Sequence, residues 1–242
     1  MDRRALVLGG GGVTGVAWET GLIAGLAGLG INLAAADVII GTSAGALVGA
    51  DITSGQELEA LYQAQLAPPE PEPPARVGWD FIGRLLWDMN TSRSPAQARA
   101  RIGRWALAAP TMPEADRQKV FQARLHSSAW PSQALKVTAV DARTGKLAVF
   151  TSAGSADLAA GYERVVIVAP VAVGIGHMVS PGRQAAALSA AGARVALVRP
   201  DREALRAIGR NMLDVSRRAA AARAGRTQAA TAAPAVRAVW QD

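Results

Sequence analysis

The segment VIIGTSAG, residues 38–45, places a serine between two glycines directly after a short apolar run. An apolar run of this length predicts a buried strand, and the small residues of 44–52 predict a buried helix. The pattern Gly-x-Ser-x-Gly between a strand and a helix forms a sharp turn that presents the serine as a nucleophile. We therefore expect Ser43 to be a candidate catalytic nucleophile, with Gly41 and Gly45 shaping its turn. The alternative is a tight turn with an unreactive serine.

A second glycine cluster, residues 9–15 (GGGGVTG), follows another short apolar run. Part of it matches the dinucleotide-binding pattern Gly-x-Gly-x-x-Gly, but that interpretation requires an acidic residue at the end of the second strand. Here that strand leads into Ser43, and Asp37 precedes it. A reaction at an acyl carbonyl instead requires backbone N–H donors for the developing oxyanion. We therefore expect the two clusters to form one site, with an oxyanion hole shaped by Gly10, Gly11 and Gly12.

Short apolar strands alternate with helices along the chain, which predicts a mainly parallel α/β sheet with helices on both faces. The text LKVTAV-DARTG-KLAVF predicts two antiparallel strands joined by a turn. Strands are expected at residues 4–8, 38–40, 135–140, 146–150, 164–169 and 193–198. Helices are expected at residues 13–29, 44–52, 56–66, 79–89, 95–107, 113–126 and 183–191. A last long helix is expected to begin at the N-cap Asp201 and to carry Met212 and Val215 on one face.

The length of the chain predicts one large domain with an appendage. Residues 1–223 are expected to form this domain. Within it, residues 68–130 begin in Pro-rich text and are expected to form a helical insertion, either as scaffold or as a lid. Its tryptophans recur at helical spacing and are expected in a core; the alternative is peripheral contact with a membrane surface. Residues 224–242 are expected to form a loose C-terminal tail.

The composition excludes several classes of function. The 242 residues include no cysteine, which rules out disulfides and thiolate catalysis and fits a cytoplasmic protein. The formal charge is +7, but the basic surplus is not interleaved with aromatic residues, so no nucleic-acid partner is expected. The apolar stretch 20–36 is interrupted by polar residues and glycines, which favours a buried helix and strand over a membrane span.

The chain resembles the patatin-like phospholipases, in particular bacterial single-domain members. The resemblance is carried by GGGGVTG (9–15), GTSAG (41–45), VTAVDARTG (137–145), ADLAAGYERVVIVAP (156–170) and RNMLDVSRRAAAARAG (210–225). It implies a three-layer α/β/α sandwich related to the α/β-hydrolases. It also implies hydrolysis of lipid acyl esters by a Ser–Asp dyad without histidine, metal or other cofactor. Ser43 would then be the nucleophile, beside an oxyanion hole formed by Gly10, Gly11 and Gly12.

The sequence departs from this family at the catalytic base. Relatives carry the aspartate in an Asp-Gly dipeptide, which this sequence lacks, and a segment is missing near Phe150–Thr151. Asp157 and Asp141 are the candidate bases, although the resemblance aligns Asp157 with a non-catalytic aspartate that caps the next helix, and Asp141 suits the turn DARTG. A triad of Ser43, Asp141 and His177 is a further alternative. Two hypotheses therefore remain: a lipid acyl hydrolase, or a catalytically silent lipid-binding protein.

Two smaller expectations follow from the same comparison with the family. Its glycine loop often carries Arg or Lys before the last glycine, where this chain has Thr14. Because the expected donors are backbone N–H groups, this change is expected to be mild. The missing segment is expected to leave apolar edges of the sheet exposed.

Overall fold

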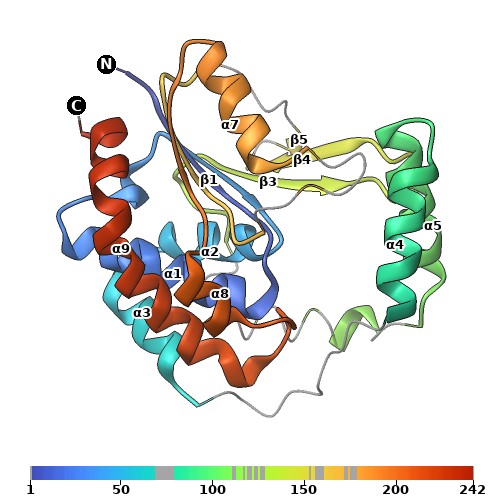
Figure 1. Cartoon of the computed structure of the whole chain (residues 1–242), viewed down its shortest axis with the longest axis horizontal. Helices are drawn as coiled ribbons and strands as arrows, with labels where there is room; N and C mark the ends of the chain where they lie inside the picture. The colour runs from blue at the N-terminus through green and yellow to red at the C-terminus, as the bar shows by residue number, and fades with distance from the viewer. Residues whose placement is uncertain are drawn as a thin grey trace.

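The central element of the protein is a single sheet. The computed structural model describes residues 2–68, 79–110, 113–116, 118, 122, 125, 129–152, 154–155, 161–171, 174 and 179–241. Within them, seven strands are arranged in the order β5-β4-β3-β2-β1-β6-β7 (Figure 1). The neighbours in the series β3-β2-β1-β6-β7 pair in parallel. Strand β4 pairs antiparallel with β3, and β5 pairs antiparallel with β4. The strands are β1 Arg4–Leu8, β2 Val38–Thr42, β3 Leu135–Val140, β4 Leu147–Thr151, β5 Gly154–Ser155, β6 Arg164–Val168 and β7 Arg194–Val198.

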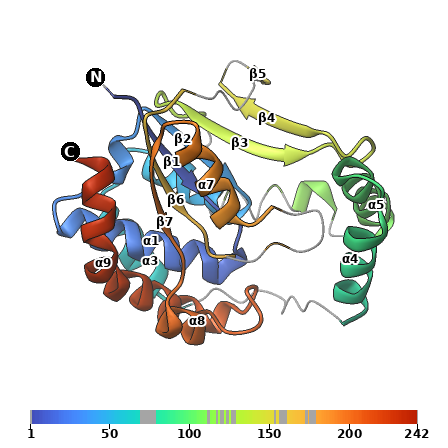
Figure 2. The ribbon, with the colours of Figure 1, turned by 45° about the horizontal axis from the view of Figure 1, so that its top comes forward.

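Helices cover both faces of this sheet and give the three-layer α/β/α arrangement expected from the sequence (Figure 2). Because side chains alternate along a strand, Leu6 and Leu8 of β1 enter one core while Ala5 enters the other. The first and larger core lies under α1 Gly12–Gly28, α2 Ala44–Ile52, α3 Leu58–Leu66, α8 Arg202–Ile208 and α9 Arg218–Trp240. The second lies under α7 Pro181–Ala190.

The C-terminal segment is not a loose tail, so that expectation is wrong. α9 extends to Trp240 and packs along α1 (Figure 1). A Cβ at Gly21 would overlap the carbonyl oxygen of Ala222, which shows how closely the two helices approach. The indole N–H of Trp240 donates to the carbonyl of Asn32 at 2.9 Å. The segment lacks large apolar residues until its end, so its periodicity is weak. Its alanines and glycines nevertheless allow the close packing.

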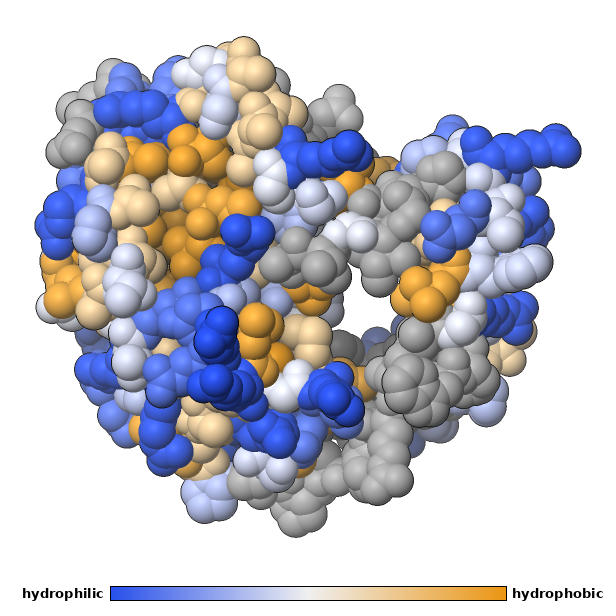
Figure 3. Space-filling view, in the orientation of Figure 1, coloured by the Kyte–Doolittle hydropathy of each residue, from blue (hydrophilic) through white to orange (hydrophobic). Residues whose placement is uncertain are grey.

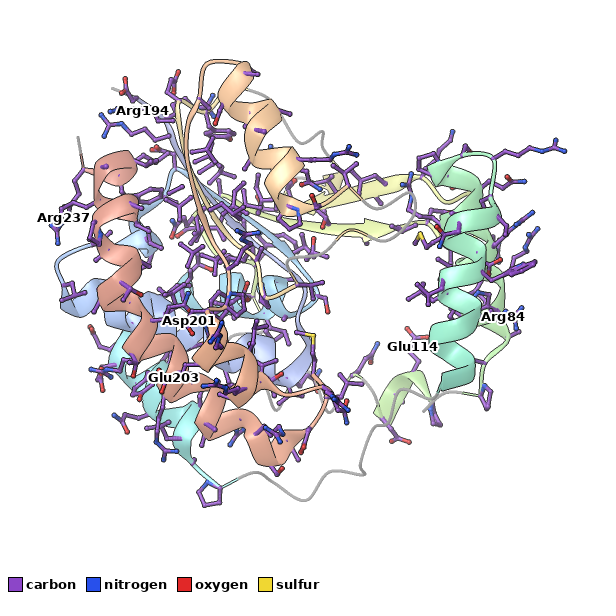
Figure 4. The ribbon with its side chains drawn as sticks, viewed as in Figure 1. Arg84, Glu114, Arg194, Asp201, Glu203 and Arg237 are labelled. Carbon is purple, nitrogen blue, oxygen red and sulfur yellow. The ribbon has the colours of Figure 1, made fainter. Side chains whose placement is uncertain are left out.

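The last expected helix is divided in two. Asp201 is its N-cap as expected, because its Oδ1 accepts a hydrogen bond from the N–H of Ala204 at 2.8 Å (Figure 4). However, α8 ends at Ile208, and Gly209 follows with a positive φ of 76°. Met212 therefore lies outside the helix, in a connection that contacts the glycine loop after β1.

The insertion forms two described helices, α4 Trp79–Thr91 and α5 Pro95–Ala108, at the far end of the β3–β4 hairpin (Figure 1). The Nε of Arg99 donates to the carbonyl of Gly145 at 2.7 Å. A Cβ at Gly103 would overlap the carbonyl oxygen of Ala142. Helix α5 is thus packed on the hairpin turn. The Pro-rich text and the helix expected at residues 113–126 lie mostly outside the described residues.

The tryptophans of the insertion do not form a common core. The indole N–H of Trp105 donates to Asp88 Oδ2 at 3.1 Å, whereas Trp87 is 68% exposed. The expectation of a core position is therefore wrong for Trp87. The side chain of Trp79 lies outside the described part.

Exposed apolar side chains mark the ends of the sheet. On the hairpin, Val140, Leu147 and Phe150 are exposed. At the opposite edge, hydrophobic side chains are visible between α7 and α9, over the edge strand β7 (Figure 3). Within the first group, Phe150 lies beside Thr151, whereas Val140 and Leu147 are paired with each other next to the hairpin turn.

Candidate active site

Ser43 stands in a strained turn between β2 and α2. Its backbone has φ 53° and ψ −114°, and no other non-glycine residue in the described part of the chain has a positive φ. Such a conformation costs about 1–3 kcal/mol and persists only where surrounding contacts enforce it. Ser43 is the N-cap of α2 and its side chain is exposed. The helix N-terminus therefore places a positive partial charge beside an accessible hydroxyl.

Steric contacts require glycine at positions 41 and 45 of the turn. A Cβ at Gly45 would overlap the carbonyl oxygen of Leu8, and a Cβ at Gly41 would overlap the carbonyl oxygen of Gly45. The N–H of Gly45 donates to the carbonyl of Gly9 at 2.9 Å, so the start of α2 is bound to the end of β1. Strand, turn and helix can approach this closely only because both positions lack a side chain.

The glycine loop lies directly beside this turn. A Cβ at Gly10 would lie 3.6 Å from the Cβ of Ser43. Gly11 is packed against Pro170, since a Cβ there would lie 2.7 Å from the proline Cβ, and Gly12 has a positive φ of 59°. Four N–H groups in this region donate no hydrogen bond to any described residue, those of Gly10, Gly11, Gly12 and Ala44. Free backbone donors around a serine are the arrangement that stabilises an oxyanion.

Glu19 binds the first residue of the glycine loop, and the sequence analysis did not identify it as part of the site. The residue lies on α1 and is fully buried; its Oε1 accepts a hydrogen bond from the N–H of Gly9 at 3.0 Å. Its Oε2 has no hydrogen-bond partner among the described residues. Burial raises the pKa of this carboxyl well above its usual range, and the bond from Gly9 offsets this only in part. The one available signal was an acidic residue within an apolar helix.

Thr14 occupies the position where the family often has a basic residue. Its N–H and its Oγ1 both donate to the carbonyl of Met212, at 3.1 and 3.3 Å. The side chain therefore binds the connection before α9 rather than the site. The threonine leaves the backbone donors of the loop in place.

An apolar cavity of about 540 Å³ opens beside Ser43. No described residue that lines it carries an ionisable side chain, and apart from Ser43 the lining consists of glycine and apolar residues. Such a cavity suits a hydrocarbon chain. The lining comes from five parts of the chain: Gly12, Val13 and Val16; Ser43, Ala44, Ala46, Leu47 and Ala50; Leu125, Ala129, Trp130 and Pro131; Leu135 and Val137; and Leu213.

Asp141 is engaged in the hairpin turn. Its Oδ1 accepts hydrogen bonds from the N–H of Thr144 at 2.7 Å, from the Thr144 hydroxyl at 2.8 Å and from the N–H of Arg143 at 3.0 Å. These bonds, that of the Thr144 N–H first, lower the pKa of Asp141. Thr42 pairs with Thr138 in the sheet, so Asp141 lies about 10 Å beyond the level of Thr42 along the strand direction.

The other candidate bases cannot be placed. Asp157 and His177 lie outside the described residues.

Among the residues that are described, no group of three or more His, Asp or Glu side chains could hold a metal ion. None of the helices in the same part of the chain has both the length and the apolarity needed to span a bilayer.

The fold and the strained turn at Ser43 define an α/β protein with a Gly-x-Ser-x-Gly turn between a strand and a helix. A family model, described as patatin-like phospholipase, matches residues 6–157. This match covers more than half of the chain, and the protein belongs to that family. Membership supports lipid acyl hydrolysis at the level of the family.

One solved structure is similar in outline, the crystal structure of the type III effector protein ExoU, with 16% sequence identity and a TM-score of 0.47. The alignment covers 100% of this chain and 54% of the ExoU chain, so the protein spans about half the length of that relative. No curated protein matches the chain in sequence.

Proposed function

We propose that the protein is a serine hydrolase of lipid acyl esters, with Ser43 as nucleophile. The Ser43 Oγ attacks the acyl carbonyl carbon, the bond to the alcohol oxygen breaks, and water then hydrolyses the acyl-enzyme. The observation that carries this proposal is the backbone of Ser43. Its positive φ, at a helix N-terminus and beside an apolar cavity, is the strained geometry that a nucleophilic serine requires.

The oxyanion of the tetrahedral intermediate would be bound by backbone N–H groups. The N–H groups of Gly10, Gly11 and Gly12 support this role, because they belong to the loop next to Ser43 and donate no hydrogen bond to a described residue. The N–H of Ala44 is a further donor of this kind, since the residue after the nucleophile commonly contributes one. Loss of one such donor costs about 10²–10³ in turnover.

Labelling with a fluorophosphonate tests the nucleophile. The reagent forms a covalent bond with an activated serine, so the wild-type protein is expected to label and Ser43→Ala is expected not to label. Ser189→Ala is the matched control, because Ser189 lies exposed on α7, far from the turn. Labelling that persists in Ser43→Ala would refute the assignment.

The proton of Ser43 needs an acceptor, and two aspartates are the candidates. Asp157 follows the hairpin in sequence, whereas Asp141 has a lowered pKa and is bound by its own turn. We expect Asp157→Asn to reduce the labelling rate by about 10⁴, the cost of removing a dyad partner, and Asp141→Asn to leave it nearly unchanged. The reverse result would assign the base to Asp141.

A catalytically silent lipid-binding protein is the second candidate function. It is favoured by one observation, the lack of an ionisable side chain among the described residues of the cavity. If the folded wild-type protein, with a cooperative thermal melt, does not label with the fluorophosphonate, the hydrolase proposal fails and this alternative stands.

A further inference from the structure

The cavity beside Ser43 has a defined axis. It is lined along α2 by Ala44, Leu47 and Ala50, which recur every three residues and so lie on one side of the helix. Ala50 is seven positions beyond Ser43, and a helix rises 1.5 Å per residue, so the lined path is about 10 Å long. The path begins at the candidate nucleophile and follows the helix toward its C-terminus.

The far end of this path is polar. A second cavity, of about 230 Å³, adjoins the first, and the two share the lining residues Ala50, Leu125, Ala129, Trp130 and Pro131. Its own lining adds the polar residues Asp51, Thr53 and Ser54, which close the C-terminus of α2. An alkyl chain that passed Ala50 would therefore exchange apolar contacts for carbonyl, hydroxyl and carboxylate groups.

Trp130 and Ala50 lie at the boundary between the two cavities. Trp130 is 41% exposed and contributes to the lining of both cavities. Ala50 contributes only a methyl group at the same level. A larger side chain at Ala50 would shorten the apolar path, and a smaller one at Trp130 would join the two cavities.

We propose that this cavity is a medium-chain acyl site, in which Ala50 and Trp130 set the chain length at about eight carbons. The assignment rests on the proposed function, because it places the acyl carbonyl at Ser43. An extended alkyl chain advances about 1.3 Å per bond of about 1.5 Å, so eight carbons span the path of about 10 Å along α2. The substrate class is thus an ester of a saturated medium-chain acid.

Equilibrium binding of fatty acids tests the length without requiring catalysis. Ser43→Ala is titrated with butyrate, octanoate, dodecanoate and hexadecanoate, below their micelle concentrations, by isothermal calorimetry. Each buried methylene strengthens binding about fourfold, so octanoate is expected to bind on the order of 10²-fold more tightly than butyrate. Beyond octanoate, each four added carbons, in dodecanoate and then in hexadecanoate, are expected to raise the binding affinity by less than about twofold.

Two variants of the boundary, made in the Ser43→Ala background, are expected to move this plateau in opposite directions. Ala50→Phe is expected to weaken octanoate by at least about tenfold and to leave butyrate unchanged. Trp130→Ala is expected to shift the plateau toward dodecanoate. Ala187→Phe on the exposed side of α7 is the matched control and is expected to leave the profile unchanged. Thermal melts of each variant establish that it is folded.

The outcomes separate this inference from the proposed function. Affinity that rises steadily from octanoate to hexadecanoate would overturn the chain-length assignment, as would an unchanged profile in folded Trp130→Ala. If Ala50→Phe does not fold, Trp130→Ala alone decides. A plateau at octanoate in a protein that does not label with fluorophosphonate would leave an acyl-binding site and remove the hydrolase.

Discussion

The strain at Ser43 can be measured by replacing the residue with glycine. Both Ser43→Gly and Ser43→Ala remove the hydroxyl, but only glycine relaxes a backbone held at φ 53° and ψ −114°. Relief of such strain is worth about 1–3 kcal/mol. The greater freedom of glycine in the unfolded chain opposes it by about 0.4–1 kcal/mol. We therefore expect Ser43→Gly to be about 1 kcal/mol more stable than Ser43→Ala.

The assay is thermal unfolding of the two variants side by side. A difference of 1 kcal/mol corresponds to about 2–4 °C in Tm for a domain of this size, well within the resolution of a calorimetric scan. Ala187→Gly provides the control, because Ala187 lies exposed within α7. There, a change from alanine to glycine is expected to cost about 1 kcal/mol, which is the opposite sign.

The comparison has a clear negative outcome. If Ser43→Gly is no more stable than Ser43→Ala while Ala187→Gly is destabilised as expected, the turn stores no strain. The geometric argument that singles out Ser43 would then lose its physical basis. A crystal structure of Ser43→Gly in which the residue keeps its positive φ would show that the surrounding turn, rather than the serine, sets the conformation.

Three further predictions concern the packing around the site. Glu19→Gln removes a buried carboxyl group whose pKa is raised in the folded protein. The stability of the wild type should fall relative to that of the variant by about 1.4 kcal/mol per pH unit, from the ordinary glutamate pKa near 4.3 up to the folded pKa. Parallel thermal melts from pH 4 to 9 in which the difference between the two proteins does not widen would contradict this. Gly21→Ala should lower unfolding free energy in urea by about 3 kcal/mol or more because of the overlap with α9, whereas Gly28→Ala, with open space around it, should be neutral or stabilising by up to about 1 kcal/mol. Trp240→Ala should lower the free energy of unfolding by about 3–5 kcal/mol in the same titration, since the ring is buried. A near-neutral result would support the expectation of a loose C-terminal tail.

The sequence predicted the turn and the core strands because these depend on local patterns. The glycines of residues 41–45 are required by contacts within one strand, one turn and one helix, so their spacing alone carries the signal. The same holds for the strands β1, β2 and β6, which are continuous apolar runs in the interior of a parallel sheet. The bounds expected for these elements agree with the structure within about two residues, the accuracy of helix and strand ends in general.

The features that were missed depend on residues far apart in the chain. Helix α9 is rich in alanine and is stabilised by its fit to α1, about 200 positions earlier, which no local periodicity reveals. Glu19 is buried and bonded to Gly9 at the end of β1, a contact that the sequence of α1 alone does not reveal. The cavity is assembled from α1, α2, β3, the segment at Trp130 and Leu213. Its shape is a property of the tertiary structure alone.

The strain at Ser43 bears on the choice between an active enzyme and a silent one. Binding of an alkyl chain requires the apolar cavity but places no demand on the backbone of Ser43, which could lie in an ordinary helical or extended conformation. Attack on a carbonyl requires an accessible hydroxyl at a sharp turn between a strand and a helix, and the positive φ of the exposed Ser43 is the strained geometry of such a turn. A fold that bears a cost of about 1–3 kcal/mol at one residue therefore favours the hydrolase. The proton acceptor must then come from residues beyond the described lining of the cavity, and Asp157, in the segment after the hairpin, is the residue to test first.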